Sequence, residues 1–142
     1  MFIGVIAVVV LIVAVVAIAA EPYIHPHTVN VLPPLTEYLE GTPIENGTAI
    51  DWGDQPPGIY YYNYTIHNNT TYPLNVTLTL EDFPYTEGFM FSWTDMETHD
   101  DLNMTIIDPE TSAIGDLTLV IPLGASGSYA WTHYIYVEEA TT

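Results

Sequence analysis

Six of the seven asparagines in the chain begin the triplet Asn-X-Ser/Thr, which is the acceptor pattern for N-linked sugars. They are Asn46, Asn63, Asn68, Asn69, Asn75 and Asn103. With this content of serine and threonine, chance would place about one such triplet among the seven asparagines. The excess predicts glycosylation at several of these sites. The triplets of Asn68 and Asn69 overlap, so we do not expect both to carry a sugar.

No other group of residues has the pattern of a catalytic or metal-binding centre. The run "DMETHDD" over 95–101 clusters carboxylates that suit a hard cation, but it lacks the spacing and the mid-loop glycine of an EF-hand. His25 and His27 supply two imidazoles, which are too few for a closed transition-metal site. The turn "GASGS" over 124–128 differs from the nucleophile motif G-x-S-x-G. We therefore expect no enzymatic activity, no catalytic residues, no metal and no cofactor.

The charge balance is one-sided. The chain has 18 acidic residues and no lysine or arginine, which gives a formal net charge of −18. Nucleic-acid binding depends on cations that neutralise phosphates, so the composition excludes it. Copies of such a chain repel one another, and association requires apolar burial, acidic pH, bound cations or a layer of sugars to offset that repulsion. The absence of cysteine excludes disulfides.

The first residues form an uninterrupted apolar run, Phe2–Ala20, of 19 residues. As a helix the run spans about 28 Å, close to the thickness of a hydrocarbon core. Three interpretations compete. "AIAA" over 17–20 matches the cleavage site of a secretory signal, although no basic residue precedes the run. A plain membrane anchor normally carries lysine or arginine on its cytoplasmic flank. The third is a mature N-terminus from which a basic leader has been removed.

The stretch "MFIGVIAVVVLIVAVVAIAA" resembles the mature N-terminus of archaeal type IV pilus-superfamily subunits, the adhesion pilins and archaellins. The resemblance covers about 20 residues. It implies a helix over 1–21 that is held in the membrane before assembly and then packs in the core of a filament. Val5 stands where bacterial type IV pilins have glutamate, and Pro22 ends the helix earlier than is usual. The side chains that the resemblance assigns to the polymerisation helix are Phe2, Ile3, Ile6, Val9, Val10, Ile12, Val13, Val16 and Ile18.

Residues 22–45 hold five prolines, at positions 22, 26, 33, 34 and 43, and are expected to form a semi-extended connector. Within it, "LTEYLEG" is compatible with one helical turn that ends before Gly41. From residue 46 to residue 142 the period changes to two. In "GIYYYNYTIHN" the alternation groups Tyr60, Tyr62, Tyr64 and Ile66 on one face, and in "YPLNVTLTLED" it groups Leu74, Val76, Leu78 and Leu80.

The sequence thus predicts an N-terminal hydrophobic helix followed by an all-β immunoglobulin-like sandwich, which is α+β only by its parts. About seven short strands at this spacing are typical of that sandwich. The expected domains are the helix over 1–21, the connector over 22–45 and the head over 46–142.

The function expected from these features is a structural subunit of an extracellular archaeal filament on the cell surface. Its partners are further copies of itself, in a helical homopolymer, and transiently the membrane; no surface receptor is identified. Adhesion is expected rather than motility.

Two alternatives remain open. One is a filament in which an extended N-terminal segment, for instance the Val/Ile-rich one, completes the sandwich of the next subunit as a strand. The other is a single-pass, membrane-anchored surface glycoprotein.

Overall fold

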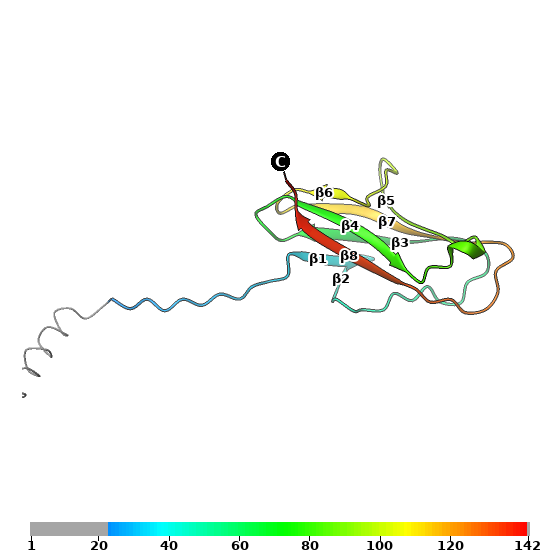
Figure 1. Ribbon diagram of the computed structural model, residues 1–142, viewed down its shortest axis with the longest axis horizontal. Helices are drawn as coiled ribbons and strands as arrows, with labels where there is room; N and C mark the ends of the chain where they lie inside the picture. The colour runs from blue at the N-terminus through cyan, green and yellow to red at the C-terminus, as the bar shows by residue number, and fades with distance from the viewer. Residues whose placement is uncertain (1–22, 142) are drawn as a thin grey trace, which may run out of the picture. The chain divides into compact units, whose positions relative to one another are not determined.

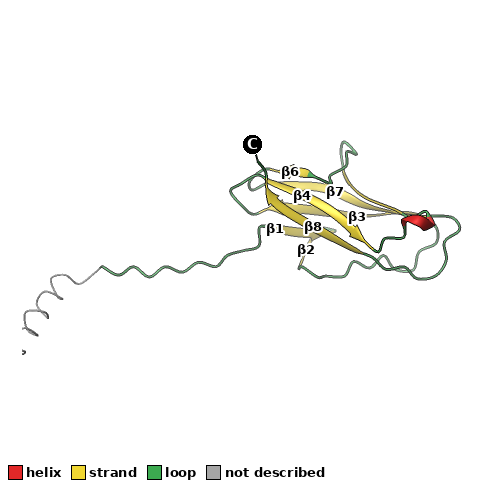
Figure 2. Cartoon of the chain, in the orientation of Figure 1, coloured by secondary structure: helices red, strands yellow, loops and turns green. Residues whose placement is uncertain are grey.

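The computed structural model describes residues 23–141, and its ordered part is a sandwich of two antiparallel sheets (Figures 1 and 2). The larger sheet has the strand order β2-β1-β3-β7-β5 and the smaller sheet has the order β6-β4-β8. The strands are β1 (Leu35–Leu39), β2 (Thr42–Ile44), β3 (Gly58–Asn68), β4 (Leu74–Glu81), β5 (Met90–Asp95), β6 (Thr105–Ile107), β7 (Ser112–Ile121) and β8 (Thr132–Glu139). A short 3-10 helix, η1 (Tyr85–Glu87), lies between β4 and β5.

Alternation of side chains decides which face of each strand is buried. Tyr64 and Ile66 of β3 are fully buried, and so is Val76 of β4. The residues between them, such as Asn63 and Thr65, lie on the outer face and are partly exposed. The period-two faces predicted for β3 and β4 are confirmed, and so is the sandwich that they imply.

The head begins earlier than the sequence indicated. The compact unit starts at Leu32, and β1 and β2 lie inside the stretch that was assigned to the connector. The segment "LTEYLEG" is a strand and a turn rather than a helical turn, because Leu35 and Leu39 face inward beside Asn68 and Tyr64 of β3. Glu40 and Gly41 both have positive φ, which is the backbone of a two-residue hairpin turn.

The helix predicted over 1–21, including all its polymerisation residues from Phe2 to Ile18, lies outside the described residues. Within residues 23–141 there is no helix with the length and apolarity needed to cross a membrane.

Trp93 fills the centre of the sandwich. Its indole nitrogen donates a hydrogen bond to the backbone oxygen of Tyr64 at 2.9 Å, and the two rings meet edge to face. Gly115, in the neighbouring strand β7, leaves the room that this indole occupies. A Cβ at position 115 would lie 2.4 Å from the backbone oxygen of Thr94, 2.5 Å from the Leu102 side chain and 2.9 Å from the indole nitrogen. Glycine at this position is thus a requirement of core packing.

We predict that Gly115→Ala lowers the free energy of unfolding by about 1–3 kcal/mol, because the added methyl collides with backbone as well as side chains. Chemical denaturation followed by tryptophan fluorescence measures it. Gly124→Ala is the matched control, since a Cβ there meets nothing within 4 Å. Equal stability of the two variants would contradict this account of the core.

Candidate functional site

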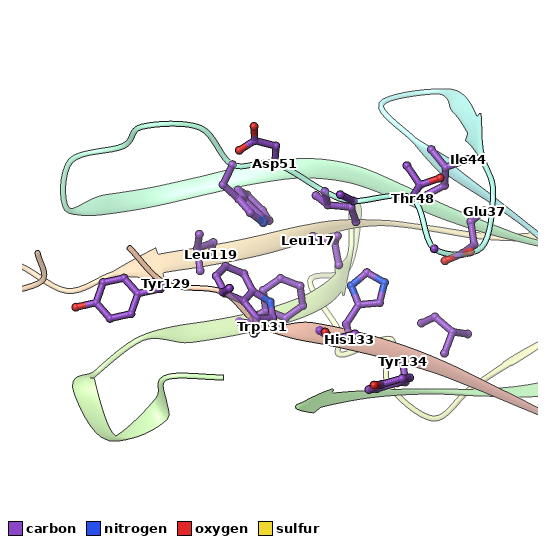
Figure 3. Close-up of a pocket in the computed structure, with 18 of the residues that line it drawn as sticks. Glu37, Ile44, Thr48, Asp51, Leu117, Leu119, Tyr129, Trp131, His133 and Tyr134 are labelled. Atoms are coloured by element: carbon purple, nitrogen blue, oxygen red, sulfur yellow. The ribbon is translucent and has the colours of Figure 1, made fainter. Parts of the chain in front are cut away.

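A groove of about 1240 Å³ runs along strand β8 between the two sheets. Its floor includes Leu117 and Leu119 of β7, one wall is the segment 45–55, and the opposite wall is β8 (Figure 3). At one end it is closed by residues 33–35, which lead into β1. The groove is larger than most small-molecule pockets, which hold about 300–1,000 Å³, and it follows a strand.

The edge of β8 that borders this groove is unpaired. Strand β8 stands at the end of the smaller sheet and pairs only with β4, from Thr132 opposite Glu81 to Glu139 opposite Leu74. Among residues 23–141, no other backbone hydrogen bond is made by β8. In an antiparallel strand, alternate residues direct N–H and C=O to each side, so β8 presents a row of free donors and acceptors to an incoming chain.

Burial falls from the middle of the smaller sheet toward this edge. The inward-facing Leu74, Val76 and Leu78 of β4 are buried, whereas the inward-facing Ile135 and Val137 of β8 are only half-buried. These β8 side chains already point into the sandwich, so the missing cover lies on their groove side. The apolar interior is therefore incomplete along β8.

The wall opposite β8 is held in place by tyrosines of β3. Tyr62 donates a hydrogen bond from its hydroxyl to the backbone oxygen of Asp51 at 2.6 Å, and Tyr60 does the same to Pro56. Trp52 packs against Tyr62 with ring centroids 4.4 Å apart and the ring planes tilted by 39°. Asp51 also accepts the N–H of Gly53. These contacts give the groove a preformed wall.

Polar groups lie in the groove where β1 meets β8. Glu37 faces inward from β1 and accepts a hydrogen bond from the Tyr64 hydroxyl. Burial raises the pKa of Tyr64, and the neighbouring Glu37 charge raises it further. His133 of β8 packs against Tyr64 and Phe91, and burial lowers its pKa although the Glu37 charge acts in the opposite direction. His133 is therefore a neutral imidazole near pH 7, beside a carboxylate.

No hydrogen bond joins His133 to a nucleophile in the described part of the chain. A serine–histidine contact does exist elsewhere, between His67 Nδ1 and Ser112 Oγ at 2.7 Å. That pair is a directly opposed cross-strand pair on the outer face of the larger sheet, away from the groove. Between residues 23 and 141 no three histidine or acidic side chains lie close enough to hold a metal ion.

The predicted sugar acceptors occupy very different environments. Asn46 is exposed in a turn closed by Thr48 N–H and the Glu45 backbone oxygen. Asn103 is also exposed; its side-chain oxygen accepts the N–H of Leu78, and its amide nitrogen donates no hydrogen bond to residues 23–141. Both present the nitrogen that would carry a sugar to solvent.

Asn63 and Asn75 lie on the outer faces of β3 and β4, in agreement with strand alternation, but both are half-buried. The Asn63 amide donates to Met96 Sδ at 3.0 Å and to the Gly115 oxygen at 3.3 Å. The Asn75 amide donates to Glu138 at 3.4 Å, and its side-chain oxygen has no partner. A sugar at either position must displace these contacts.

Asn68 and Asn69 form the turn after β3. Asn68 is completely buried, and its amide donates to the backbone oxygens of Tyr72 and Ile107 at 2.7 and 2.9 Å. Asn69 binds the other side of the turn, with its backbone N–H on the Pro34 oxygen and its side-chain amide on the Pro33 oxygen. In the folded head these two asparagines stabilise the turn, and their nitrogens are poorly placed to carry a sugar.

The two remaining candidate clusters have ordinary structural surroundings. Asp95, the first residue of "DMETHDD", accepts the backbone N–H groups of Glu97 and Thr98, and these bonds lower its pKa. The carboxylate is thus engaged in closing its own turn. His25 and His27 are exposed in the segment that precedes the head.

Sequence reasoning did not single out the groove residues Glu37, Trp52, Trp131 and His133. A signal was present for Glu37, which interrupts the apolar alternation of Leu35 and Leu39. Trp131, just before β8, and His133 share the parity of the inward-facing Ile135 and Val137, and the other face of β8 carries Tyr134 and Tyr136. Nothing in either pattern reveals that the two strands border the same open groove.

We predict that stability depends on pH through His133. Its pKa is lowered in the folded head, so the unfolded chain binds the proton first, and stability falls as the pH drops below about 6.5. His133→Phe keeps the ring contacts and removes the titration. The difference in unfolding free energy, wild type minus variant, should decrease between pH 7.5 and pH 5. A difference that stays constant over this range would contradict the burial of a neutral imidazole.

We also predict that the intact mass of the natural protein exceeds the 15.8 kDa of the bare chain by several sugar units. Occupancy should be highest at the exposed Asn46 and Asn103 and absent at the buried Asn68. Mass spectrometry after digestion with an acid-specific protease locates the sites, since trypsin has no residue to cleave after. A mass equal to the bare chain would make the triplet excess a by-product of threonine-rich strands.

No family model matches the chain, and neither a curated protein nor a solved structure is significantly similar to it.

Proposed function

We propose that the chain is a structural subunit of an extracellular filament on the cell surface, and that it polymerises with copies of itself. The observation that carries the proposal is the incomplete sandwich, in which the free edge of β8 lies beside an open apolar groove. An isolated head would leave both exposed, and unpaired edges with apolar surroundings pair readily with another chain. In our proposal the head is an immunoglobulin-like sandwich, and the buried Trp93 between two antiparallel sheets supports that classification.

The N-terminal segment gives the proposed filament its core. Residues 1–21 are uncharged apart from Glu21, and their resemblance to archaeal pilins supports a helix that leaves the membrane and packs against its copies. Lipid is as apolar as the packed helices, so the gain lies in van der Waals contacts between them. Gly4 and the many alanines permit close approach of the helices.

The surface of the head is consistent with an outer layer of such a filament. Ile59, Val120 and Met90 are directly opposed on β3, β7 and β5, on the outer face of the larger sheet, and Ile59 and Met90 are largely exposed. This apolar row suits a lateral contact between heads. Sugars on exposed asparagines would cover part of the acidic surface and reduce the repulsion between copies. We assign the filament to adhesion, without catalytic activity, cofactor or nucleic-acid partner.

A single-pass surface glycoprotein remains the second candidate, because the apolar segment also has the length of a membrane anchor. The open groove is what favours a polymer over a solitary anchored head, since an anchor alone does not require an unfilled sandwich.

We predict that Val9→Asp abolishes filaments, because it would place a charge in the packed apolar core at a cost of several kcal/mol per copy. Val9→Leu, which preserves the apolar core, should assemble normally. Electron microscopy of cells that produce each variant measures the outcome. Normal filaments from Val9→Asp would rule out an apolar helical core, and a wild-type chain that stays monomeric in the membrane would support the anchored glycoprotein.

A further inference from the structure

We infer that the groove along β8 binds residues 27–32 of a second copy of this chain, which add to the free edge of β8 as a fourth strand of the smaller sheet. This inference rests on the proposed self-assembly and names its contact. It differs from the alternative in which the apolar segment 2–20 is the donated strand.

The donor segment has the pattern of a strand without being paired as one. Residues 27–32 read "HTVNVL", have no secondary structure, and lie between Pro26 and Pro33. Val29 and Val31 share one face, and they are 81% and 86% exposed. Thr28 and Asn30 occupy the opposite face. A half-buried strand has this alternation, and Val29 and Val31 match the apolar floor of the groove.

The length and the prolines also fit. Six residues extend about 20 Å, within the roughly 26 Å of the eight-residue strand β8. Proline lacks the N–H that a ladder requires, so prolines are tolerated at the ends of a strand and exclude longer pairing. Pro26 and Pro33 therefore delimit the one stretch of this segment that can pair along its whole length.

Charge favours the same segment. Residues 22–34 contain no acidic residue, although the chain as a whole has 18. The groove is lined by four acidic residues, Glu37, Glu45, Asp51 and Asp54, and an uncharged strand approaches it without the repulsion that an acidic segment would meet. Histidine is the only residue type in this chain whose side chain can become positively charged. Two of the five histidines, His25 and His27, lie in this segment.

The chain's own segment is poorly suited to fill its own groove. Residues 33–35 line one end of the groove and continue into β1, so filling it from within requires a reversal just before β1. Leu32 and Pro33 each precede a proline, which biases both toward extended backbone. Asn69 holds the oxygens of Pro33 and Pro34 at 3.1 and 2.9 Å. A reversal there would have to break these contacts, whereas a neighbouring copy needs none.

The test uses the full-length chain and exploits its lack of cysteine. Asn30→Cys is labelled with a benzophenone maleimide, and filaments are assembled from equal amounts of ¹⁴N and ¹⁵N chains and irradiated. Digestion and mass spectrometry should then find mixed-isotope cross-links from position 30 to β8, near the outward-facing Tyr134 and Tyr136. An identical probe at Val9→Cys should not reach β8.

Two sets of variants in the labelled chain provide the matched comparison. Val29→Asp and Val31→Asp put a charge on the face that enters the groove and should reduce the cross-link about tenfold or more. Thr28→Asp adds the same charge two residues from the probe, on the face that points away from the groove, and should preserve the cross-link. None of these positions belongs to a strand of the head, so loss of the cross-link would not reflect unfolding.

The outcomes separate this inference from the proposed function. Filaments without cross-links to β8 would overturn the inference and leave the filament proposal standing. Cross-links that never join a ¹⁴N chain to a ¹⁵N chain would show contact within one chain and would also overturn it. Cross-links to β8 from position 9 instead of position 30 would do the same. Mixed-isotope cross-links in closed dimers, with no filaments, would support the strand addition and contradict the filament.

Discussion

The three-stranded sheet of the head is too narrow to cover the inner face of the five-stranded sheet. The open groove and the unpaired edge of β8 both follow from this difference in width. Burial of apolar surface holds the two sheets together, and it is complete only where the sheets overlap. Strand β4, in the middle of the smaller sheet, buries its inner side chains fully, whereas β8 at the edge buries Ile135 and Val137 only in part. The same edge leaves backbone donors and acceptors unpaired. An apolar groove and a free strand edge are thus two consequences of one arrangement, and both are relieved by one added strand.

The strongly acidic composition limits which segments could pair with this edge. With a formal net charge of −18 and no lysine or arginine, copies of the head repel one another at every acidic surface. In the proposed filament, contacts between copies would therefore use uncharged segments. The apolar N-terminal run, the acid-free residues 22–34 and the outer row with Ile59 and Met90 are such segments. The carboxylate of Glu37 inside the groove is held by the Tyr64 hydroxyl, so it is compensated by a neutral donor rather than by a cation.

The asparagines of the sugar-acceptor triplets have different structural roles in the folded head. Asn68 and Asn69 satisfy the acceptor pattern, yet their side chains close the turn between β3 and β4 and anchor the residues that lead into β1. Asn103, which precedes β6, satisfies the pattern, and its side-chain oxygen accepts a hydrogen bond from the N–H of Leu78 in β4. An asparagine in such a triplet can stabilise the fold, present a sugar acceptor to solvent, or do both. Burial of its side-chain amide nitrogen distinguishes these cases.

The sequence by itself determined the features that depend on local pattern. The period of two in β3 and β4 identified their buried faces, because alternation is a property of the extended backbone. The one-sided charge predicted that nucleic acid is not a partner, and the acceptor triplets were visible directly. The tertiary structure decided what depends on distant contacts. Residues 35–39 form a strand because β3 pairs with them, and residues 42–44 form a second strand that pairs with the first; this pairing overrode a proline-rich composition. The unequal division of strands between the sheets, the meeting of Glu37 with His133, and the open edge of β8 follow from pairing between segments up to about a hundred residues apart. No local pattern encodes them.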